Sequence, residues 1–304
     1  MAILPHRGIA GENTVANLLQ IARACLVAAG GDGIDARIDA EILLSHATGL
    51  SVAALVADAD RCVPGAPAAA FRNLVARRAG GEPVAYLTGR KEFWSLELTM
   101  TPAVLIPRPE TELLVEQALA CAAGRRGLRV LELGTGSGAV ALALAFELCG
   151  CAITATDSSP AAIAVARANQ RRLGGAVAQP GSGAVEFRVG DWFAALPEGE
   201  RFDLIVCNPP YIAPHDPHLR QGDLRFEPHA ALVSAHDGLA DLAKIIADAP
   251  LRLTPRGALL LEHGHTQAVA VRDMLLQHAF TAIATCRDLG GHERVTLGIW
   301  GSVA

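Results

Sequence analysis

Apolar side chains recur at helical spacing through the first 90 residues of the chain. In the segment that follows Asn13, for example, Leu18, Ala22 and Leu26 fall on one face of a helix with 3.6 residues per turn. The same spacing predicts helices over residues 14–29, 36–48, 51–57 and 67–78. We therefore predict a helical domain over residues 1–90, which is long enough to fold as a separate unit.

The pattern changes at residues 91–106, where apolar and β-branched side chains stand close together without a helical period. Pro102, Pro107 and Pro109 exclude a continuous helix, because proline lacks an N–H and restricts the residue before it. This segment is predicted to be a β-hairpin or an extended linker. A helix is expected to begin near Thr111.

From residue 107 onward, short apolar runs alternate with helical patterns. The pattern predicts strands over residues 128–133, 152–156, 185–189, 202–207, 258–262 and 294–299, and helices over residues 139–148, 161–173, 240–253 and 266–278. Such alternation is typical of a parallel, doubly wound sheet, in which ligands bind at the carboxyl ends of the strands. We predict an α/β domain over residues 107–304, interrupted by a glycine-rich insertion at residues 174–183.

The composition excludes several classes of protein. A hydrophobic fraction of 51% with 19% charged residues excludes a mainly disordered chain, and a net charge of −5 argues against coating nucleic acid by charge alone. The longest clean apolar run, residues 139–146, is far shorter than the roughly 20 residues of a membrane span. We recognise no secretory signal and expect a cytoplasmic protein. The seven cysteines form no Cys-x-x-Cys pair, so buried reduced thiols are expected rather than disulfides or a zinc site.

A glycine-rich turn follows the first predicted strand of the α/β domain, with the residues Gly134, Thr135, Gly136, Ser137 and Gly138. Glycines permit a tight turn and let a ligand approach the backbone, and the helix that follows offers free N–H groups. These five residues are candidates for binding a nucleotide-like cofactor. Their spacing also fits a dinucleotide fingerprint, so the turn alone leaves two kinds of ligand open.

Three acidic residues and an aromatic residue bear on this choice. Asp157, 19 residues after the last glycine, suits the hydroxyl pair of a ribose in either ligand. Glu132 favours an amine-bearing ligand over a pyrophosphate, because like charges repel strongly in a poorly solvated site. Asp191 and Trp192 could bind and cover an adenine, although Trp192 suits core packing equally well. The sequence therefore favours S-adenosylmethionine, which becomes S-adenosylhomocysteine after methyl transfer.

The most specific motif is Asn208, Pro209, Pro210 and Tyr211, directly after a predicted strand. The prolines donate no N–H, so this loop presents carbonyl oxygens and the Asn208 amide as acceptors for a planar –NH₂ group. Tyr211 could stack on the flat face of that group. Asn208, Pro209 and Tyr211 are the candidate catalytic residues, and all four are candidates for substrate binding. A strong base is not required, because a methylated amide nitrogen becomes acidic and loses its proton to water.

Two histidines near the carboxyl end are weaker candidates. His263 and His265 stand beside Glu262 and resemble a metal pair, but a third ligand at suitable spacing is missing from the local sequence. We expect structural roles for them and no metal. The residues after Tyr211 are expected to form a mobile loop on the substrate side.

These motifs, taken together, resemble the HemK/PrmC family of protein-(glutamine-N5) methyltransferases. The resemblance covers nearly the whole chain and includes, besides the motifs above, residues 81–89, 92–94, 105–112, 221–228, 286–288 and 292–295. It implies a Rossmann-like, class I S-adenosylmethionine-dependent domain, a connecting β-hairpin and a helical N-terminal domain that docks the substrate. It also implies that the substrate is the glutamine in the Gly-Gly-Gln motif of class-1 peptide chain release factors. The glycine turn, Asp157, Asp191 and Trp192 would then bind the cofactor, and Asn208 would contact both cofactor and substrate. A monomer that needs no nucleic acid or membrane is expected.

Several alternatives remain open from the sequence. The sister enzyme that modifies a ribosomal-protein glutamine typically reads Pro-Arg-Ser-Pro where this chain reads Pro107-Arg108-Pro109-Glu110. An adenine amino-methyltransferase would be expected to carry a basic or aromatic region for base flipping. A dinucleotide oxidoreductase leaves Asn208 to Tyr211 unexplained, and a non-catalytic scaffold would be expected to lose this motif.

Overall fold

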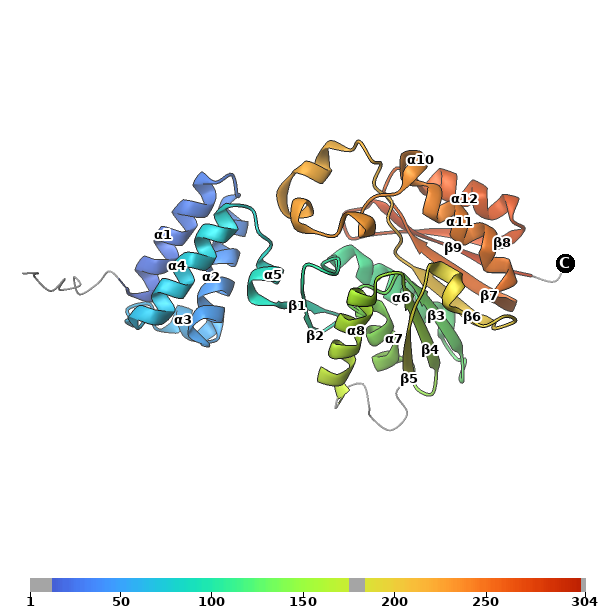
Figure 1. The fold of residues 1–304 in the computed structure, drawn as a ribbon, viewed down its shortest axis with the longest axis horizontal. Helices are drawn as coiled ribbons and strands as arrows, with labels where there is room; N and C mark the ends of the chain where they lie inside the picture. Colours follow the sequence, from blue (N-terminus) through green and yellow to red (C-terminus); the bar gives the residue numbers. More distant parts are fainter. Residues whose placement is uncertain (1–12, 175–183, 302–304) are drawn as a thin grey trace, which may run out of the picture. The chain divides into compact units, whose positions relative to one another are not determined.

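The computed structural model describes residues 13–174 and 184–301 of the chain, which form two compact units that meet between Gly89 and Arg90 in the sequence (Figure 1). Residues 175–183 of the predicted glycine-rich insertion lie outside the described residues. The two units are described separately below.

The first unit is a bundle of helices. It contains α1 (Val15–Ala28), α2 (Gly33–Thr48), α3 (Val52–Ala57), α4 (Gly65–Ala79) and α5 (Val84–Thr88). The side chains of Thr14 and Ser51 cap α1 and α3 by accepting N–H bonds of the first turn. Leu18, Leu43 and Phe71 are among the buried side chains that join α1, α2 and α4. The sequence did not predict α5, whose five residues are too few to show a helical period.

The second unit begins with an antiparallel hairpin of β1 (Arg90–Phe93) and β2 (Leu96–Thr99). Trp94 and Ser95 form its turn with positive φ values of 52° and 58°, the backbone geometry that matches the twist of a tight hairpin. Glu112 accepts a hydrogen bond from the Trp94 N–H at 2.9 Å, and Asn169 accepts one from the Thr99 N–H at 2.7 Å. These bonds hold the hairpin against the α/β fold.

A seven-stranded sheet forms the centre of the second unit (Figure 1). Its strands are β3 (Arg129–Leu133), β4 (Ala152–Asp157), β5 (Ala184–Val189), β6 (Phe202–Cys207), β7 (Leu253–Glu262), β8 (Phe280–Arg287) and β9 (Glu293–Trp300), in the order β5-β4-β3-β6-β7-β9-β8. The first five of these strands pair in parallel, whereas β9 is antiparallel to both β7 and β8. The prediction of a wholly parallel sheet is therefore wrong at this edge.

The edge differs from the prediction because β8 was not recognised. Most of its side chains are at least partly exposed, so it lacks the apolar run that marked the central strands. A strand inserted before β9 reverses the direction of β9. The predicted helix over residues 240–253 also ends early, at Asp248, because Pro250 disfavours a helical residue before it.

Helices cover both faces of this sheet. They are α6 (Glu112–Ala122), α7 (Ala139–Glu147), α8 (Pro160–Arg172), α10 (Ala235–Gly238), α11 (Ala240–Asp248) and α12 (Ala268–Gln277). Short 3-10 turns occur at η1 (Pro109–Thr111), η2 (Trp192–Ala195), η3 (Pro217–Arg220), η4 (Gly222–Phe226), η5 (His229–Ala231) and η6 (Ala249–Leu251). Among the described residues, none of the helices combines the length and the apolar character that crossing a membrane requires.

The cysteines are free, but their burial differs from the prediction. Cys151 and Cys207 are buried as expected, whereas Cys25, Cys62 and Cys149 are exposed. The expectation of burial was wrong for these three, because Cys25 lies on the exposed face of α1, Cys62 lies in the segment between α3 and α4, and Cys149 lies just after the end of α7.

Candidate functional site

A cavity of about 220 Å³ lies at the carboxyl ends of β3, β4 and β6. Its wall comes from the segment after the hairpin, the glycine turn, the residues that follow β4, β5 and β6, and the η5 turn. The lining residues are Ala103, Val104, Leu105, Gly134, Gly136, Asp157, Ser158, Ser159, Ala162, Asp191, Trp192, Asn208, Pro210, Pro228, Ala230 and Ala231. This is the edge at which ligands of parallel sheets bind.

The glycine turn reaches this cavity at two positions. Gly134 has φ of +71°, and a Cβ atom there would stand 3.3 Å from the Trp192 ring. Gly136 has φ of +54°, and its N–H donates to Asp157 Oδ2 at 2.9 Å. A side chain at Gly134 would therefore meet the ring that forms part of the cavity wall.

The other three predicted residues of the turn do not line the cavity. Thr135 and Ser137 are buried, and the Ser137 carbonyl accepts a hydrogen bond from Asn169 Nδ2. A Cβ atom at Gly138 would stand 3.2 Å from side-chain atoms of Ala166 and Leu142. These residues shape the turn and pack it against α7 and α8.

Glu132, which the sequence analysis placed against an amine-bearing ligand, also lies inside the protein. Its Oε2 accepts hydrogen bonds from the Thr135 hydroxyl at 2.5 Å and from the Ala141 N–H at 3.1 Å. Burial raises the pKa of Glu132 to about 8, although the Thr135 and Ala141 hydrogen bonds oppose this shift. The structure thus corrects the interpretation: Glu132 ties the glycine turn to the start of α7 and is not part of the cavity wall.

Asp157, Asp191 and Trp192 all lie on the cavity wall, as the sequence analysis expected of cofactor-binding residues. Asp157 accepts N–H bonds from Gly136 and Ser159, which leaves further lone pairs on its carboxylate. Asp191 is exposed and forms an ion pair with Lys244 at 2.5 Å. Trp192 also packs against the apolar core, which confirms the core-packing interpretation, and its role in covering an adenine stays a prediction.

A second cavity of about 60 Å³ lies on the other side of Asn208. Its lining residues are Leu105, Arg108, Asn208, Pro209, Tyr211, Ile212, Leu224, Ala231 and Leu232. Asn208 lines both cavities, whereas Pro210 lines the larger one and Pro209 and Tyr211 line the smaller one. The four motif residues are therefore divided between the two cavities, with Asn208 at their boundary.

The Asn208 amide has a defined orientation. Its Nδ2 donates to the Thr111 hydroxyl at 3.2 Å. Among the described residues, none donates a hydrogen bond to its Oδ1. The carbonyl oxygen is consequently free to accept a bond from a ligand in either cavity.

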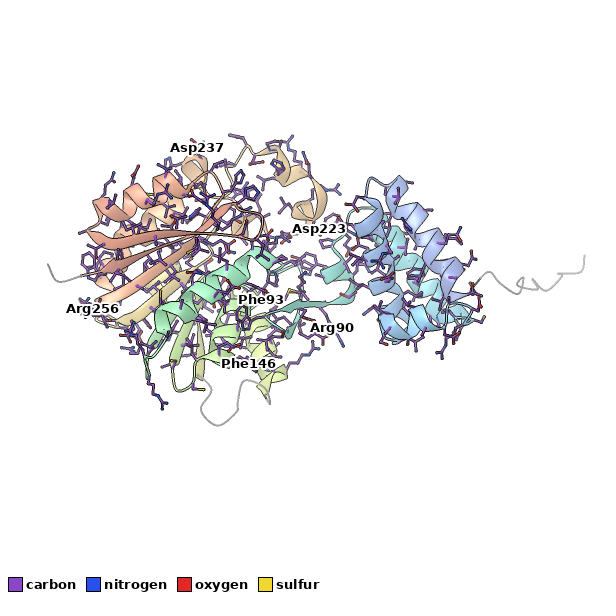
Figure 2. The ribbon with its side chains drawn as sticks, turned by 180° about the vertical axis from the view of Figure 1, so that it is seen from behind. Arg90, Phe93, Phe146, Asp223, Asp237 and Arg256 are labelled. Carbon is purple, nitrogen blue, oxygen red and sulfur yellow. The ribbon has the colours of Figure 1, made fainter. Side chains whose placement is uncertain are left out.

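Tyr211 is held by contacts that the sequence did not reveal. Its backbone carbonyl accepts a hydrogen bond from Gln267 Nε2 at 3.0 Å, and a Cβ atom at Gly238 would stand 2.1 Å from the same carbonyl oxygen. Gly238 follows His236 and Asp237, of which Asp237 is labelled in Figure 2, and all three residues have positive φ. The backbone of this turn therefore passes directly behind Tyr211, where only glycine fits.

A buried carboxyl group lies behind the motif as well. Glu262, at the end of β7, is 1% exposed and accepts a hydrogen bond from the Tyr211 hydroxyl at 3.4 Å. Its Oε2 is buried and has no hydrogen-bond partner among the described residues. Burial raises the pKa of Glu262 to about 7, against the opposing effects of the Thr111 hydroxyl and the Arg294 charge. Burial likewise raises the pKa of the Tyr211 phenol.

The loop after Tyr211 is anchored to the segment before α6. Glu227 accepts a hydrogen bond from the Ile106 N–H at 3.0 Å and forms a salt bridge with Arg108, whose side chain lines the smaller cavity. Asp223, labelled in Figure 2, lies in the η4 turn of this loop. The resemblance singled out Glu227, but only the structure shows that it closes the loop onto Arg108.

His263 and His265, for which structural roles were expected, have protein partners. His263 is fully buried, and its ring nitrogens contact the Gly264 carbonyl at 2.9 Å and the Thr296 hydroxyl at 2.8 Å. His265 packs against the ring of His292. Within residues 13–174 and 184–301, His, Cys, Asp and Glu side chains do not gather in threes as a metal ion would need.

Comparison with known proteins identifies both units. The PrmC N-terminal domain matches residues 17–89, and a methyltransferase domain matches residues 125–289. The chain is 49% identical to the release factor glutamine methyltransferase of Pseudomonas aeruginosa over 269 residues, which are 88% of this chain and 94% of that protein. The chain belongs to the release factor glutamine methyltransferase family.

Other members of the release factor glutamine methyltransferase family are similarly close. The Bordetella pertussis member is 50% identical over 86% of this chain and 94% of its own length. Among solved structures, a methyltransferase from Pyrococcus furiosus has a TM-score of 0.51 at 20% identity and covers 77% of this chain and 100% of that chain. The rRNA methyltransferase RsmC of T. thermophilus has the same TM-score at 22% identity, covering 69% of this chain and 49% of that chain. At these identities the two structures support the methyltransferase fold and nothing finer.

Proposed function

We propose that this protein transfers a methyl group from S-adenosylmethionine to the side-chain amide nitrogen of the glutamine in the Gly-Gly-Gln motif of class-1 peptide chain release factors. The observation that carries the proposal is the position of Asn208. It lines both cavities, and its Oδ1 is unpaired among the described residues. One side chain can thus contact a cofactor on one side and a substrate amide on the other.

The residues of the larger cavity fit S-adenosylmethionine. Its wall has the bare backbone of Gly134 and Gly136, a carboxylate at Asp157 and an indole at Trp192. We propose that Asp157 binds the ribose hydroxyls and that Asp191 and Trp192 hold the adenine. When bound, S-adenosylmethionine supplies an electrophilic methyl group.

The smaller cavity fits the side chain of a glutamine. Asn208 Oδ1 and the carbonyl of Pro209, a residue that has no N–H, would accept the two hydrogens of the glutamine –NH₂ group. These acceptors fix the nitrogen in place and stabilise the positive charge that develops on it. Pro210 and Tyr211 complete the walls around the amide. After the nitrogen–carbon bond forms, the nitrogen releases a proton to water.

Labelled methyl transfer to a purified class-1 release factor tests this proposal. We expect label on the normal factor and none on a variant in which the glutamine of Gly-Gly-Gln is alanine. Label on both proteins would place the modification elsewhere. Absence of label on both, with cofactor binding intact, would favour the ribosomal-protein or adenine substrates instead.

We further propose that the helical unit docks the release factor. It exposes large apolar side chains on α1 and α2, among them Ile21, Ile38 and Ile42. Ile38→Asp should raise KM for a whole release factor roughly tenfold and leave KM for a short Gly-Gly-Gln peptide unchanged, because the peptide lacks the docking surface. Equal effects on the two substrates would contradict the docking role.

The setting of the reaction follows from the substrate. Release factors act on ribosomes, so we propose that the protein works in the cytoplasm. We also propose that it works as a monomer and without bound nucleic acid. Sedimentation of the purified protein tests whether it is a monomer. Unchanged transfer after nuclease treatment tests whether it works without nucleic acid. A dimer, or loss of transfer after nuclease treatment, would contradict these proposals.

A further inference from the structure

Four polar side chains lie at and behind the walls of the two cavities. Asn208 Nδ2 donates to the Thr111 hydroxyl at 3.2 Å, and the Tyr211 hydroxyl donates to Glu262 Oε1 at 3.4 Å. The Thr111 hydroxyl lies close enough to Glu262 to lower the pKa of that carboxyl. Thr111 and Glu262 are 4% and 1% exposed, and neither lines a cavity. Two hydrogen bonds therefore lead inward from the cavity residues, one from Asn208 to Thr111 and one from Tyr211 to the Glu262 carboxyl.

The direction of these hydrogen bonds decides what Asn208 offers to a ligand. A primary amide can bind the substrate –NH₂ group only if its oxygen, and not its nitrogen, faces that group. Thr111 Oγ1 keeps the Asn208 nitrogen on the inner side by accepting its hydrogen. The Thr111 hydroxyl must then direct its own hydrogen elsewhere, and the Glu262 carboxyl, whose pKa this hydroxyl lowers, is the candidate acceptor.

Glu262 lies where its carboxyl group can interact with both the Thr111 and the Tyr211 hydroxyl. In the parallel register Leu261 lies beside Cys207, so Glu262 lies beside Asn208. The titratable and charged groups that face it are Arg294 on β9, Glu110 in η1, the Tyr211 hydroxyl and the Cys207 thiol on β6. Its Oε2 has no hydrogen-bond partner among the described residues, so the Thr111 and Tyr211 hydroxyls and the Arg294 charge are the groups that compensate a negative charge on Glu262.

We propose that Glu262 is a positioning residue that acts through Thr111 to hold the Asn208 amide with Oδ1 toward the substrate and that holds the Tyr211 hydroxyl directly. The proposal rests on the proposed function, in which Asn208 Oδ1 accepts a hydrogen from the substrate glutamine. It adds two residues to the site that touch neither substrate nor cofactor.

The charge on Glu262 gives the proposal a pH signature. An ionised carboxylate accepts from both hydroxyls, whereas a protonated one becomes a donor and competes with Asn208 for the Thr111 oxygen. Because burial raises the pKa of Glu262 to about 7, kcat at saturating substrates should fall as pH drops through about 7. Glu262→Gln should remove this acid limb.

Three variants separate positioning from general stability. Thr111→Val removes the hydroxyl at nearly constant volume and should lower kcat by roughly ten- to a hundredfold, with cofactor affinity kept within about threefold. Thr111→Ser retains the hydroxyl and should stay within about threefold of the wild type. Thr296→Val is the matched control, since its buried hydroxyl bonds His263 and Thr285 rather than the motif. A kcat for Thr111→Val equal to that of Thr296→Val would overturn the proposal.

A spectroscopic measurement tests the same proposal without activity. The chain has five asparagines, so selective labelling gives a small set of side-chain amide signals, and Asn208→Ala identifies that of Asn208. The Asn208 signal should shift as pH crosses about 7 in the wild type and stay constant in Glu262→Gln. A pH-independent signal in the wild type would overturn the proposal. Absence of methyl transfer by the wild type would instead refute the proposed function, and the labelled amide would still report on Glu262.

Discussion

Two buried carboxyl groups flank the strand that carries Asn208, and they differ in how they are satisfied. Glu132 on β3 bonds to Thr135 and Ala141, which lie three and nine residues further along the chain. Glu262 on β7 meets Tyr211, 51 residues away, and keeps one oxygen without a partner among the described residues. The first carboxyl fixes a local turn, whereas the second joins distant segments.

This difference separates the two halves of the site. On the cofactor side, Glu132 fixes the glycine turn from within its own strand–turn–helix unit, and Asp157 and Asn169 bind the same turn from the neighbouring β4 and α8. On the substrate side, Asn208 and Tyr211 depend on η1, β7, α10 and the turn before α12. We therefore expect changes on the substrate side to affect turnover and changes on the cofactor side to affect cofactor affinity.

The largest expected effect is at the boundary between the two sides. Asn208→Ala should lower kcat by roughly a hundredfold or more, because it removes the acceptor that orients the substrate nitrogen. Steady-state transfer to the release factor measures this effect, and circular dichroism checks that the protein remains folded. Near-normal turnover would contradict the role of Asn208.

A pair of glycine substitutions contrasts the two sides directly. Gly238→Ala places a Cβ 2.1 Å from the Tyr211 carbonyl at a φ of +84° and should lower the free energy of unfolding by roughly 2–4 kcal/mol and reduce kcat. Gly134→Ala meets the Trp192 ring at 3.3 Å and should mainly weaken cofactor binding. Denaturant titration and cofactor calorimetry measure the two effects. Equal loss of cofactor affinity in both variants would contradict the separation of the site into a cofactor side and a substrate side.

Asp157→Ala should have a smaller effect that is confined to the cofactor side. We expect roughly tenfold weaker binding of S-adenosylmethionine, since the carboxylate acceptor of the ribose is lost. Calorimetric titration of the purified protein measures the dissociation constant. An unchanged constant would exclude Asp157 from the cofactor site.

The last expected effect is on the pH dependence of stability, which involves neither ligand. Burial raises the pKa of Glu132 to about 8 and that of Glu262 to about 7, so between pH 4.5 and these values the folded chain binds more protons than the unfolded chain. The free energy of unfolding should therefore fall as pH rises through this range. Glu132→Gln and Glu262→Gln should each reduce this fall by on the order of 2 kcal/mol, up to about pH 8 and pH 7 respectively. If the free energy of unfolding falls with pH as steeply in both variants as in the wild type, the raised pKa values of these two buried carboxyl groups are contradicted.

The sequence predicted features whose residues are adjacent in the chain. The helices of the first unit, the hairpin, the central strands and the two motifs all have a local pattern. Glu132 shows where this approach fails, because a sequence does not reveal whether a side chain at the end of a strand faces the cavity or the turn.

Features built by distant residues were not predicted. Thr111 was recognised as a helix start and Glu262 as a weak metal candidate, but their proximity to Asn208 and Tyr211 depends on the pairing of β6 with β7. Gly238 and Gln267 act on the Tyr211 carbonyl from segments with no motif of their own. The Asn208–Tyr211 motif was the sequence signal for this side of the site, and Glu262 at the end of an apolar run was the one hint of the residues behind that motif.

Fragmentation mass spectrometry of the product tests the central claim most directly. A release factor incubated with the protein and S-adenosylmethionine should gain a single methyl group, located on the side-chain nitrogen of the glutamine in Gly-Gly-Gln. The same incubation with Asn208→Ala should leave this glutamine unmodified. A methyl group on another residue, or full modification by Asn208→Ala, would contradict the account.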